Sequence, residues 1–494
     1  MNYGQFFNMI PETCLVLMLI ITFVMDFVLG YDLKRKQQQQ SGDADHLNML
    51  ATVMMLILTV ICFTSIASCN PQIEAFGGMY VATQAATVMK TILAAGTLIV
   101  CIQARQWLSR PDTSFKAGEF YMLVESTLLG MFVMMSSGHF LMFFLGLEMA
   151  SVPMACLVGL DKYRHNSAEA AAKFILTATF SSGVMLYGIS MLYGATGTLY
   201  FDDFSQKLIQ SIRIYPSALS IVGLVFFASG LGFKLSLVPF HFWTADTYQG
   251  APTTVTGYLS VISKGAAAFT LCVILMKAFP AMIDQWEMWL YIVIVLSITV
   301  ANLFAIRQSE LKRFMAFSSI SQAGYIMLAV VGNSAHGVAA LSYYVLIYVV
   351  ANMAVFTVIS AVEEANGGRT DMDAYNGFYQ TNPKLSLLMT LALFSLAGIP
   401  PFAGMFSKFF VFMAAAQEGS YASYFVVFIA LINTVVSLYY YLLIVKAMYI
   451  KAEDNPLPTF QTTTSTKLAL GICTAGILLF GICSFFYDWI YQAV

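Results

Sequence analysis

The chain has 494 residues, of which 59% are hydrophobic and 10% are charged, and its formal net charge is -2. Soluble domains carry about 25% charged residues, so this composition excludes an ordinary soluble protein and predicts an all-α polytopic membrane protein. The small net charge and the lack of a long basic run give no indication of a nucleic-acid partner. The eight cysteines are scattered without a C-x-x-C pair, which argues against a zinc site, an iron–sulfur cluster or a disulfide framework.

Fourteen apolar runs of about 20 residues are candidate transmembrane helices, because a helix of that length crosses the hydrocarbon core of a bilayer. In chain order they cover residues 10–30, 48–67, 83–104, 119–137, 139–160, 168–194, 217–243, 253–276, 286–306, 312–332, 336–362, 385–415, 421–449 and 466–490. The fourth and fifth runs are separated only at Gly138. The polar stretches between the runs are too short for a soluble domain.

The distribution of Lys and Arg predicts the orientation of these helices. With the N-terminus outside, sixteen of the 24 basic residues lie in inner loops, three lie in outer loops and five fall within the spans. This positive-inside bias, together with an even number of spans, places both termini on the outer side of the membrane. The first span has no basic residue before it and is followed by Lys34, Arg35 and Lys36, so we expect an uncleaved helix.

Four charged residues lie in the middle of apolar runs: Glu148, Lys234, Lys264 and Lys408. A charge at the bilayer centre costs about 2.5–3.5 kcal/mol on insertion scales, and intramembrane ionisable residues are usually functional. We therefore interpret these residues as parts of a proton or cation path through the helix bundle. The alternative is that they form ion pairs that serve only the structure.

Other ionisable residues have simpler explanations. Lys90 lies within a span and is expected to pair with another side chain or to lie at an interface. His139 and His336 stand at predicted outer ends of spans and are expected at the surface. No metal-binding cluster and no phosphate-binding or dinucleotide-binding loop is predicted in this chain.

Two spans contain prolines, which remove a backbone donor and break a helix. Pro239 follows Lys234 by five residues, and Pro400 and Pro401 precede Lys408 by about two turns. Broken helices five spans apart predict two inverted five-helix repeats, as in many secondary transporters. The predicted segments are three N-terminal helices at 1–118, a first repeat at 119–276, a second repeat at 286–449 and a C-terminal helix at 450–494.

A carboxylate inside a membrane should seek a cation, and Lys234 is the candidate partner of Glu148. Separating such a pair in a dry environment would make the lysine release its proton more readily, so the pair could act as a switch. Lys264 would be the next residue of the proton path, and Lys408 would be the last one before the outer face of the membrane. His241 follows Lys234 by seven residues and would share its helix face if the break is ignored, so it is either a relay residue or a polar residue near the inner mouth.

Several long segments between about 119 and 415 resemble the antiporter-like membrane subunits of respiratory NADH–quinone oxidoreductase (complex I), and within that family the N type. They include EFYMLVESTLLGMFVMMSSGHFLMFFLGLEMASVPMACLVG, GFKLSLVPFHFWTADTYQGAPTTVTGYLSVISKGAAAF and LFSLAGIPPFAGMFSKFFVF. Any one segment would also resemble the sister subunits and Mrp-type antiporters. Their combination is specific.

The resemblance assigns roles residue by residue. The family's glutamate of helix five falls on Glu148, and its lysines of helices seven, eight and twelve fall on Lys234, Lys264 and Lys408. The last match favours the N type, because the M type has a glutamate there. The D-x-Y-x-G-A-P signature of the N type falls on Asp246, Tyr248, Gly250, Ala251 and Pro252.

The resemblance implies a proton-translocating subunit of NADH:quinone oxidoreductase in the inner membrane of a bacterium. It implies that NADH or another donor, FMN, iron–sulfur clusters and quinone belong to partner subunits, with no redox centre in this chain. The implied neighbours are M-type, L-type, K-type and J-type subunits and the lipid bilayer. The alternatives are a subunit of an Mrp-type cation/proton antiporter and a scaffold of the membrane arm that does not pump.

Overall fold

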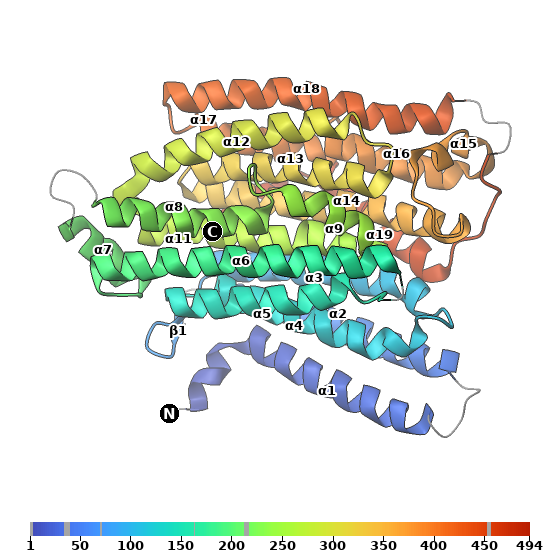
Figure 1. Cartoon of the computed structure of the whole chain (residues 1–494), viewed down its shortest axis with the longest axis horizontal. Coiled ribbons are helices and arrows are strands. Elements are labelled where there is room, and N and C mark those ends of the chain that lie inside the picture. The colour runs from blue at the N-terminus through green and yellow to red at the C-terminus, as the bar shows by residue number, and fades with distance from the viewer. Residues whose placement is uncertain (1–2, 34–39, 70–71, 163, 212–216, 452–455) are drawn as a thin grey trace. The chain divides into compact units, whose positions relative to one another are not determined.

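A computed structural model describes residues 3–33, 40–69, 72–162, 164–211, 217–451 and 456–494 (Figure 1). Lys34, Arg35 and Lys36, which the topology prediction places on the inner side, and Arg213, which it places on the outer side, lie outside these ranges. The described part is helical apart from one antiparallel hairpin of β1 (Ile73–Ala75) and β2 (Tyr80–Ala82). The prediction of an all-α polytopic fold is confirmed.

Thirteen helical segments of the described chain are long and apolar enough to cross a membrane. Two shorter apolar helices, α16 (Pro383–Ala397) and α17 (Ala403–Ala416), occupy the place of the predicted twelfth span. The fourth and fifth predicted spans are separate helices, because residues 136–139 form a turn between them. These segments together account for the fourteen predicted spans.

The chain divides into two compact units. The first contains Met1–Leu235, Ser263–Trp289 and Ala493–Val494, and the second contains Ser236–Ile262 and Leu290–Gln492. The predicted repeats at 119–276 and 286–449, and their inverted relation, stay predictions.

The first unit is built mainly from long helices that pack pairwise. They are α1 (Ile10–Leu33), α2 (Gln40–Ser65), α3 (Gln84–Leu108), α4 (Ala117–Met135), α5 (Phe140–Val158), α6 (His165–Thr196), α7 (Phe201–Ser211), α8 (Ala218–Leu235) and α11 (Lys264–Ala278). Helix α5 packs between α4 and α6, and α6 packs along α8 (Figure 1). Helix α11 is fully surrounded within this unit, because α3, α4, α7 and α8 all contact it.

The second unit contains the remaining helices. They are α9 (Phe242–Gly250), α10 (Thr253–Tyr258), α13 (Leu311–Val331), α14 (Ala335–Ala365), α15 (Phe378–Thr381), α16, α17, α18 (Tyr421–Tyr449), α19 (Thr464–Ile482) and α20 (Phe485–Gln492), with most of α12 (Ile283–Ala305). Helices α13 and α14 form its core, and α16, α17 and α19 pack against α14.

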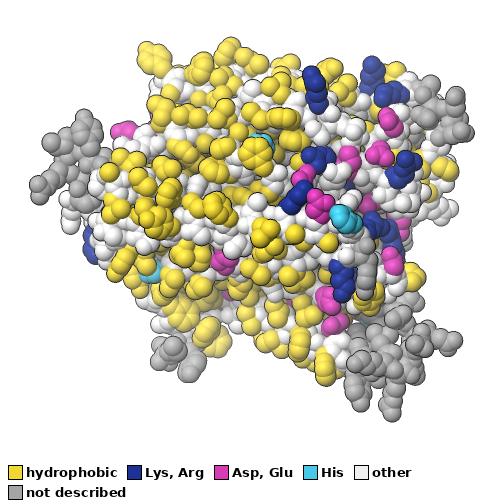
Figure 2. All heavy atoms as spheres, in the orientation of Figure 1, with side chains coloured by type: hydrophobic (Ala, Val, Ile, Leu, Met, Phe, Trp, Pro, Cys, Tyr) yellow, Lys and Arg dark blue, Asp and Glu magenta, His cyan; other side chains and the backbone are white. Residues whose placement is uncertain are grey.

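The surface matches a lipid environment. Figure 2 shows hydrophobic side chains over most of the visible face, with Lys, Arg, Asp and Glu gathered toward one edge. Helix α1 exposes Leu17, Phe23 and Phe27, each more than half accessible. Such contiguous apolar faces are unfavourable in water and are expected where acyl chains or partner helices cover them.

Candidate functional site

Close packing of two helices of the first unit positions Glu148, which is half-buried. Gly130 of α4 and Gly146 of α5 let the two backbones touch: a Cβ on Gly130 would come within 2.4 Å of Ala150 N, and one on Gly146 within 2.6 Å of Met134 N. Small residues at a helix crossing allow this approach in membranes. The contact fixes the depth and rotation of α5, and with them the position of Glu148.

Lys234 stands in the last turn of α8 and is 6% exposed. Its Nζ donates a hydrogen bond to Ser151 Oγ at 2.8 Å, and Ser151 in turn donates to the carbonyl of Leu147 at 2.6 Å. Ser151 lies one turn beyond Glu148 on α5.

The expected direct ion pair between Glu148 and Lys234 is not formed in this structure. Although both residues are described, no ion pair joins them, and Glu148 Oε1 has no hydrogen-bond partner among the described residues. The partner of the Lys234 ammonium is therefore the neutral hydroxyl of Ser151.

The helix break after Lys234 begins at Leu235, the residue whose carbonyl the Pro239 ring excludes from helical hydrogen bonding. Helix α8 ends at Leu235, and Ser236 adopts a left-handed backbone conformation with φ +61°. The freed backbone is satisfied locally, because Val238 N donates to Ser297 Oγ at 2.9 Å. His241 stands at the N-cap of the next helix, α9. His241 and Lys234 thus belong to different helices and different units, so the helix face that they would share without the break is not formed, and the relay role of His241 stays a prediction.

Lys264 is the first residue of α11 and is 1% exposed. A π-helical turn, Leu259–Ser263, immediately precedes it. Such turns insert an extra residue into a helix and are frequent at functional sites. Within this turn, Ser260 accepts a hydrogen bond from Asn352 Nδ2 at 2.6 Å. The irregular turn was not predicted, because its sequence carries no proline or glycine.

Lys408 lies on α17 and reaches back across the second break. Its Nζ donates to the carbonyl of Ala397, the last residue of α16, at 2.9 Å, and lies 5.0 Å from the centre of the Tyr325 ring. Gly398 ends α16 with φ +88°, and a Cβ there would come within 3.1 Å of Lys408 Cδ. A cation at a helix C-terminus is favoured by the helix dipole, so the break and the lysine stabilise each other.

A buried polar network continues from this break and was missed by the sequence reasoning. Gln322 Nε2 donates to the carbonyl of Leu396 at 3.3 Å and to Tyr441 OH at 3.2 Å, and Tyr344 OH donates to Gln322 Oε1. Tyr441 also exchanges a hydrogen bond with Ser318 at 2.5 Å. The signal for it was Gln322 in the predicted span 312–332, together with the serines at 318, 319 and 321.

The D-x-Y-x-G-A-P signature contacts the start of α13. Arg313 donates to Asp246 Oδ1 at 2.6 Å, and Lys312 Nζ donates to the carbonyl of Ala251 at 2.7 Å. Tyr248 accepts from Ser319 at 3.1 Å. The signature residues therefore hold α9 and the α9–α10 turn against α13.

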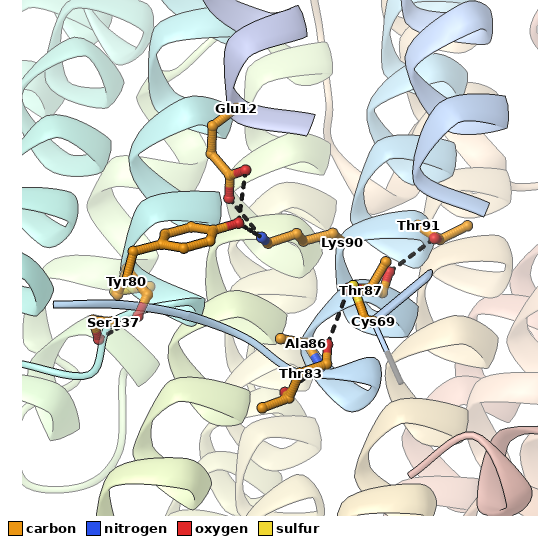
Figure 3. A network of polar contacts seen from close by, with 10 residues as sticks. Glu12, Cys69, Tyr80, Thr83, Ala86, Thr87, Lys90, Thr91 and Ser137 are labelled. Carbon is orange, nitrogen blue, oxygen red and sulfur yellow. Dashed lines mark hydrogen bonds and ion pairs between the residues drawn. The ribbon is translucent and has the colours of Figure 1, made fainter. Parts of the chain in front are cut away.

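Lys90, a buried lysine outside the predicted path, has a direct counter-ion. Lys90 Nζ lies 2.5 Å from Glu12 Oε1, and Tyr80 OH donates to Glu12 Oε2 at 3.0 Å (Figure 3). Lys90 Nζ is also 3.3 Å from Tyr80 OH and 5.7 Å from the centre of the Phe132 ring. Lys90 and Glu12 are 1% and 3% exposed. The expectation that Lys90 is a pairing residue agrees with this geometry.

His139 is buried instead of lying at the surface. It is the N-cap of α5, and its Nδ1 accepts a hydrogen bond from Leu141 N at 3.0 Å. Its ring packs edge-on against Tyr200, with centroids 4.5 Å apart. Burial lowers the pKa of His139. The bridge between the α4–α5 turn and Tyr200 encloses the ring, and the sequence did not indicate this contact.

The arrangement suits proton transfer more than redox or metal chemistry. Hydroxyl groups both donate and accept hydrogen bonds, so they can link a lysine to its neighbours along a proton path. Within the described residues, no group of three or more His, Cys, Asp or Glu side chains is placed to hold a metal ion. The first unit holds Glu148, Lys234 and Lys264, and the second holds Lys408 and its network.

Comparison with known proteins identifies the family. Residues 137–437, which include Glu148, Lys234, Lys264 and Lys408, match the family described as NADH:quinone oxidoreductase/Mrp antiporter, TM. The NADH-quinone oxidoreductase subunit N of Phocaeicola vulgatus is 55% identical over 489 residues, which cover 99% of this chain and 98% of that protein.

Solved structures share the fold. A chain of respiratory complex I from Thermus thermophilus is 29% identical with a TM-score of 0.76, and the match covers 96% of this chain and 97% of that one. A chain of the Mrp complex from Dietzia is 17% identical with a TM-score of 0.81, covering 100% and 97%, and shows the fold alone. The chain belongs to the family of NADH:quinone oxidoreductase and Mrp antiporter membrane subunits, among the relatives named subunit N.

Proposed function

We propose that this chain is a proton-translocating membrane subunit of a bacterial NADH–quinone oxidoreductase. In this proposal, quinone reduction in partner subunits drives proton transfer along Glu148, Lys234, Lys264 and Lys408. Donor oxidation, FMN, the iron–sulfur clusters and quinone belong to those partners. The subunit spans the inner membrane with both termini outside and neighbours other antiporter-like and small membrane-arm subunits.

The observation that carries the proposal is the difference between the partner of Lys90 and the partners of Lys234 and Lys408. Lys90 sits directly on a carboxylate, as a structural ion pair does. Lys234 and Lys408 instead donate to neutral oxygens, Ser151 Oγ and Ala397 O. An ammonium group buried without a direct counter-ion is costly to keep charged, so it is suited to losing and regaining a proton.

The charge on Glu148 supplies the control in this scheme. With the carboxylate ionised and near, the Lys234 ammonium is stabilised. When the carboxylate is protonated or moves away, Lys234 releases its proton more readily, and the Ser151 hydroxyl remains as its hydrogen-bond partner. A rearrangement of α5 against α8 is therefore the event that would couple the energy of the partner subunits to proton movement.

The test is Lys234→Met in the assembled complex, with quinone reduction and proton uptake into vesicles read on one sample. Proton-transfer groups contribute about 10²–10⁴ in rate, so we expect both coupled activities to fall by about a hundredfold while assembly persists. Lys207→Met is the matched control, because Lys207 is an exposed lysine of the same unit on α7.

Each outcome separates the alternatives. Normal activities in Lys234→Met would refute the relay role of Lys234. Reduced complex yield with unchanged pumping per turnover would favour a scaffold. Cation/proton exchange by a wild-type complex that contains no redox subunits would favour an antiporter.

A further inference from the structure

A cavity in the second unit has the features of a lipid-binding site. Its volume is about 860 Å³, within the range of about 300–1,000 Å³ that ligand pockets show. The first turns of α16 and α19 and the segment 459–462 surround it. We propose that this cavity holds an anionic phospholipid of the bilayer, a ligand separate from the proton path.

The mouth of the cavity is positively charged. Lys384, the second residue of α16, and Lys467, the fourth residue of α19, both line it and are exposed. No acidic side chain occurs among the described residues of the lining. The N-termini of α16 and α19 add partial positive charge at the same place. A phosphodiester headgroup is the complement of this arrangement.

The polar wall of the mouth is held in place by side-chain hydrogen bonds. Asn382 Nδ2 donates to the carbonyl of Pro458 at 3.3 Å, and its Oδ1 accepts from Phe460 N at 3.3 Å. Thr459 Oγ1 donates to the carbonyl of Thr381 at 2.9 Å. The segment after Pro458 is therefore tied to the start of α16, so the hollow is a built feature of the fold.

The inner part of the cavity is apolar and suits an acyl chain. Leu385, Leu388, Leu470 and Ala475 line it. From Lys467 to Ala475 the helix rises about 12 Å, which approaches the roughly 15 Å of one leaflet's hydrocarbon. Gly471 faces this space, and a Cβ built there meets nothing within 4 Å. Charge at the mouth and open apolar depth behind it match one diacyl lipid with its headgroup outward.

The predicted orientation places this mouth on the cytoplasmic side. Both Lys384 and Lys467 belong to loops assigned to that side by the positive-inside count. Basic pockets between transmembrane helices on the cytoplasmic side are known binding sites for anionic headgroups. The assignment of the lipid does not depend on proton pumping, so failure of one proposal leaves the other intact.

The test compares phosphatidylglycerol with phosphatidylcholine on the purified assembled complex, with bound lipid counted by mass spectrometry. Each basic residue near an anionic lipid contributes about a fivefold gain in affinity, so Lys384→Gln/Lys467→Gln should lower affinity for phosphatidylglycerol about thirtyfold. The matched control is Lys446→Gln/Lys451→Gln, which removes two exposed lysines that do not line the cavity.

A second variant fills the cavity without touching its charge. Gly471→Leu should displace the lipid, because its side chain enters space that no protein atom occupies. Gly183→Leu on α6 is its control, since a Cβ at Gly183 also meets nothing within 4 Å and that glycine lies outside the cavity.

The proposed lipid site is refuted if substitution of the control lysines lowers phosphatidylglycerol binding as much as substitution of the cavity lysines. Diffuse surface charge would then be enough to explain the binding. It is equally refuted if Gly471→Leu leaves phosphatidylglycerol binding unchanged. Equal binding of phosphatidylcholine, insensitive to the cavity lysines, would show an unselective groove and overturn the proposal. Lys467→Gln alone keeps the test available if the double variant fails to assemble.

Discussion

Replacing Lys90 by Met should destabilise the first unit severely. The change leaves the Glu12 carboxylate buried at 3% exposure, with Tyr80 OH still donating a hydrogen bond to it. Removing one member of a buried ion pair costs about 3–5 kcal/mol, because the remaining charge keeps its desolvation penalty. At about 1.4 kcal/mol for each power of ten, the unfolded fraction should rise by about two to three and a half powers of ten.

Removing all three polar groups should reverse most of this loss. In Lys90→Met/Glu12→Leu/Tyr80→Phe no buried charge remains, and replacing a buried pair by apolar residues of similar size is often neutral or stabilising. The assay is the half-life of the full chain in detergent at fixed temperature, followed by size exclusion. Tyr121→Phe is the matched control, because it removes one hydroxyl that donates to Asn48 at 3.0 Å, also buried in this unit.

The reasoning fails if the triple variant is as short-lived as Lys90→Met. That result would mean that the charges themselves, and not the penalty of an unpaired one, are needed. A long-lived Lys90→Met would contradict it in the other direction, by showing that Glu12 is protonated or hydrated in place.

Three further predictions concern capping and the second break. The hydrogen bond from Leu141 N to His139 Nδ1 requires a neutral His139, and burial lowers the pKa of His139. This stabilisation is therefore present above the unfolded pKa of about 6.5 and is lost as the pH falls below it. His139→Asn should flatten the acidic part of the stability–pH profile, and an unchanged profile would exclude the cap as its cause. Gly398→Ala should lower the free energy of unfolding by about 1–2 kcal/mol, because the backbone at this position is left-handed, and should displace Lys408. Coupled proton uptake should fall more than the yield of the complex. Equal losses of proton uptake and yield would indicate misfolding only. Gly404→Ala should abolish assembly, because a Cβ there would come within 1.6 Å of a carbonyl oxygen of α16, and normal yield would show that α17 can move away.

The helices were predictable from sequence because the bilayer dictates their length and apolar composition. Helix α1 begins at Ile10, where its predicted span begins, and the short turn at Gly138 correctly divided α4 from α5. Pro239 indicated a break after Lys234, but the left-handed conformation of Ser236 within it has no sequence signal. The π-helical turn before Lys264 was missed for the same reason.

Partners of the buried charges were less predictable than the charges themselves. Glu148 and Ser151 lie one turn apart on the same helix, so the sequence could place both near Lys234 but not decide which one it contacts. Lys90 and Glu12 are 78 residues apart in the sequence, and no local sequence pattern predicts that they pair. The relay roles of Glu148, Lys234, Lys264, Lys408 and His241 stay predictions.

The ion pair between α1 and α3 also constrains how the protein is made. Glu12 and Lys90 are separated by 78 residues, so at about 5–20 residues per second the ribosome delivers the lysine about 4–16 s after the glutamate. During that interval α1 carries an acidic group that has no cation to meet in the bilayer. Glu12 lies in the first turn of α1, near the membrane boundary, where its carboxylate can stay in contact with water. The ion pair that buries Glu12 can therefore form only after the third helix has been made.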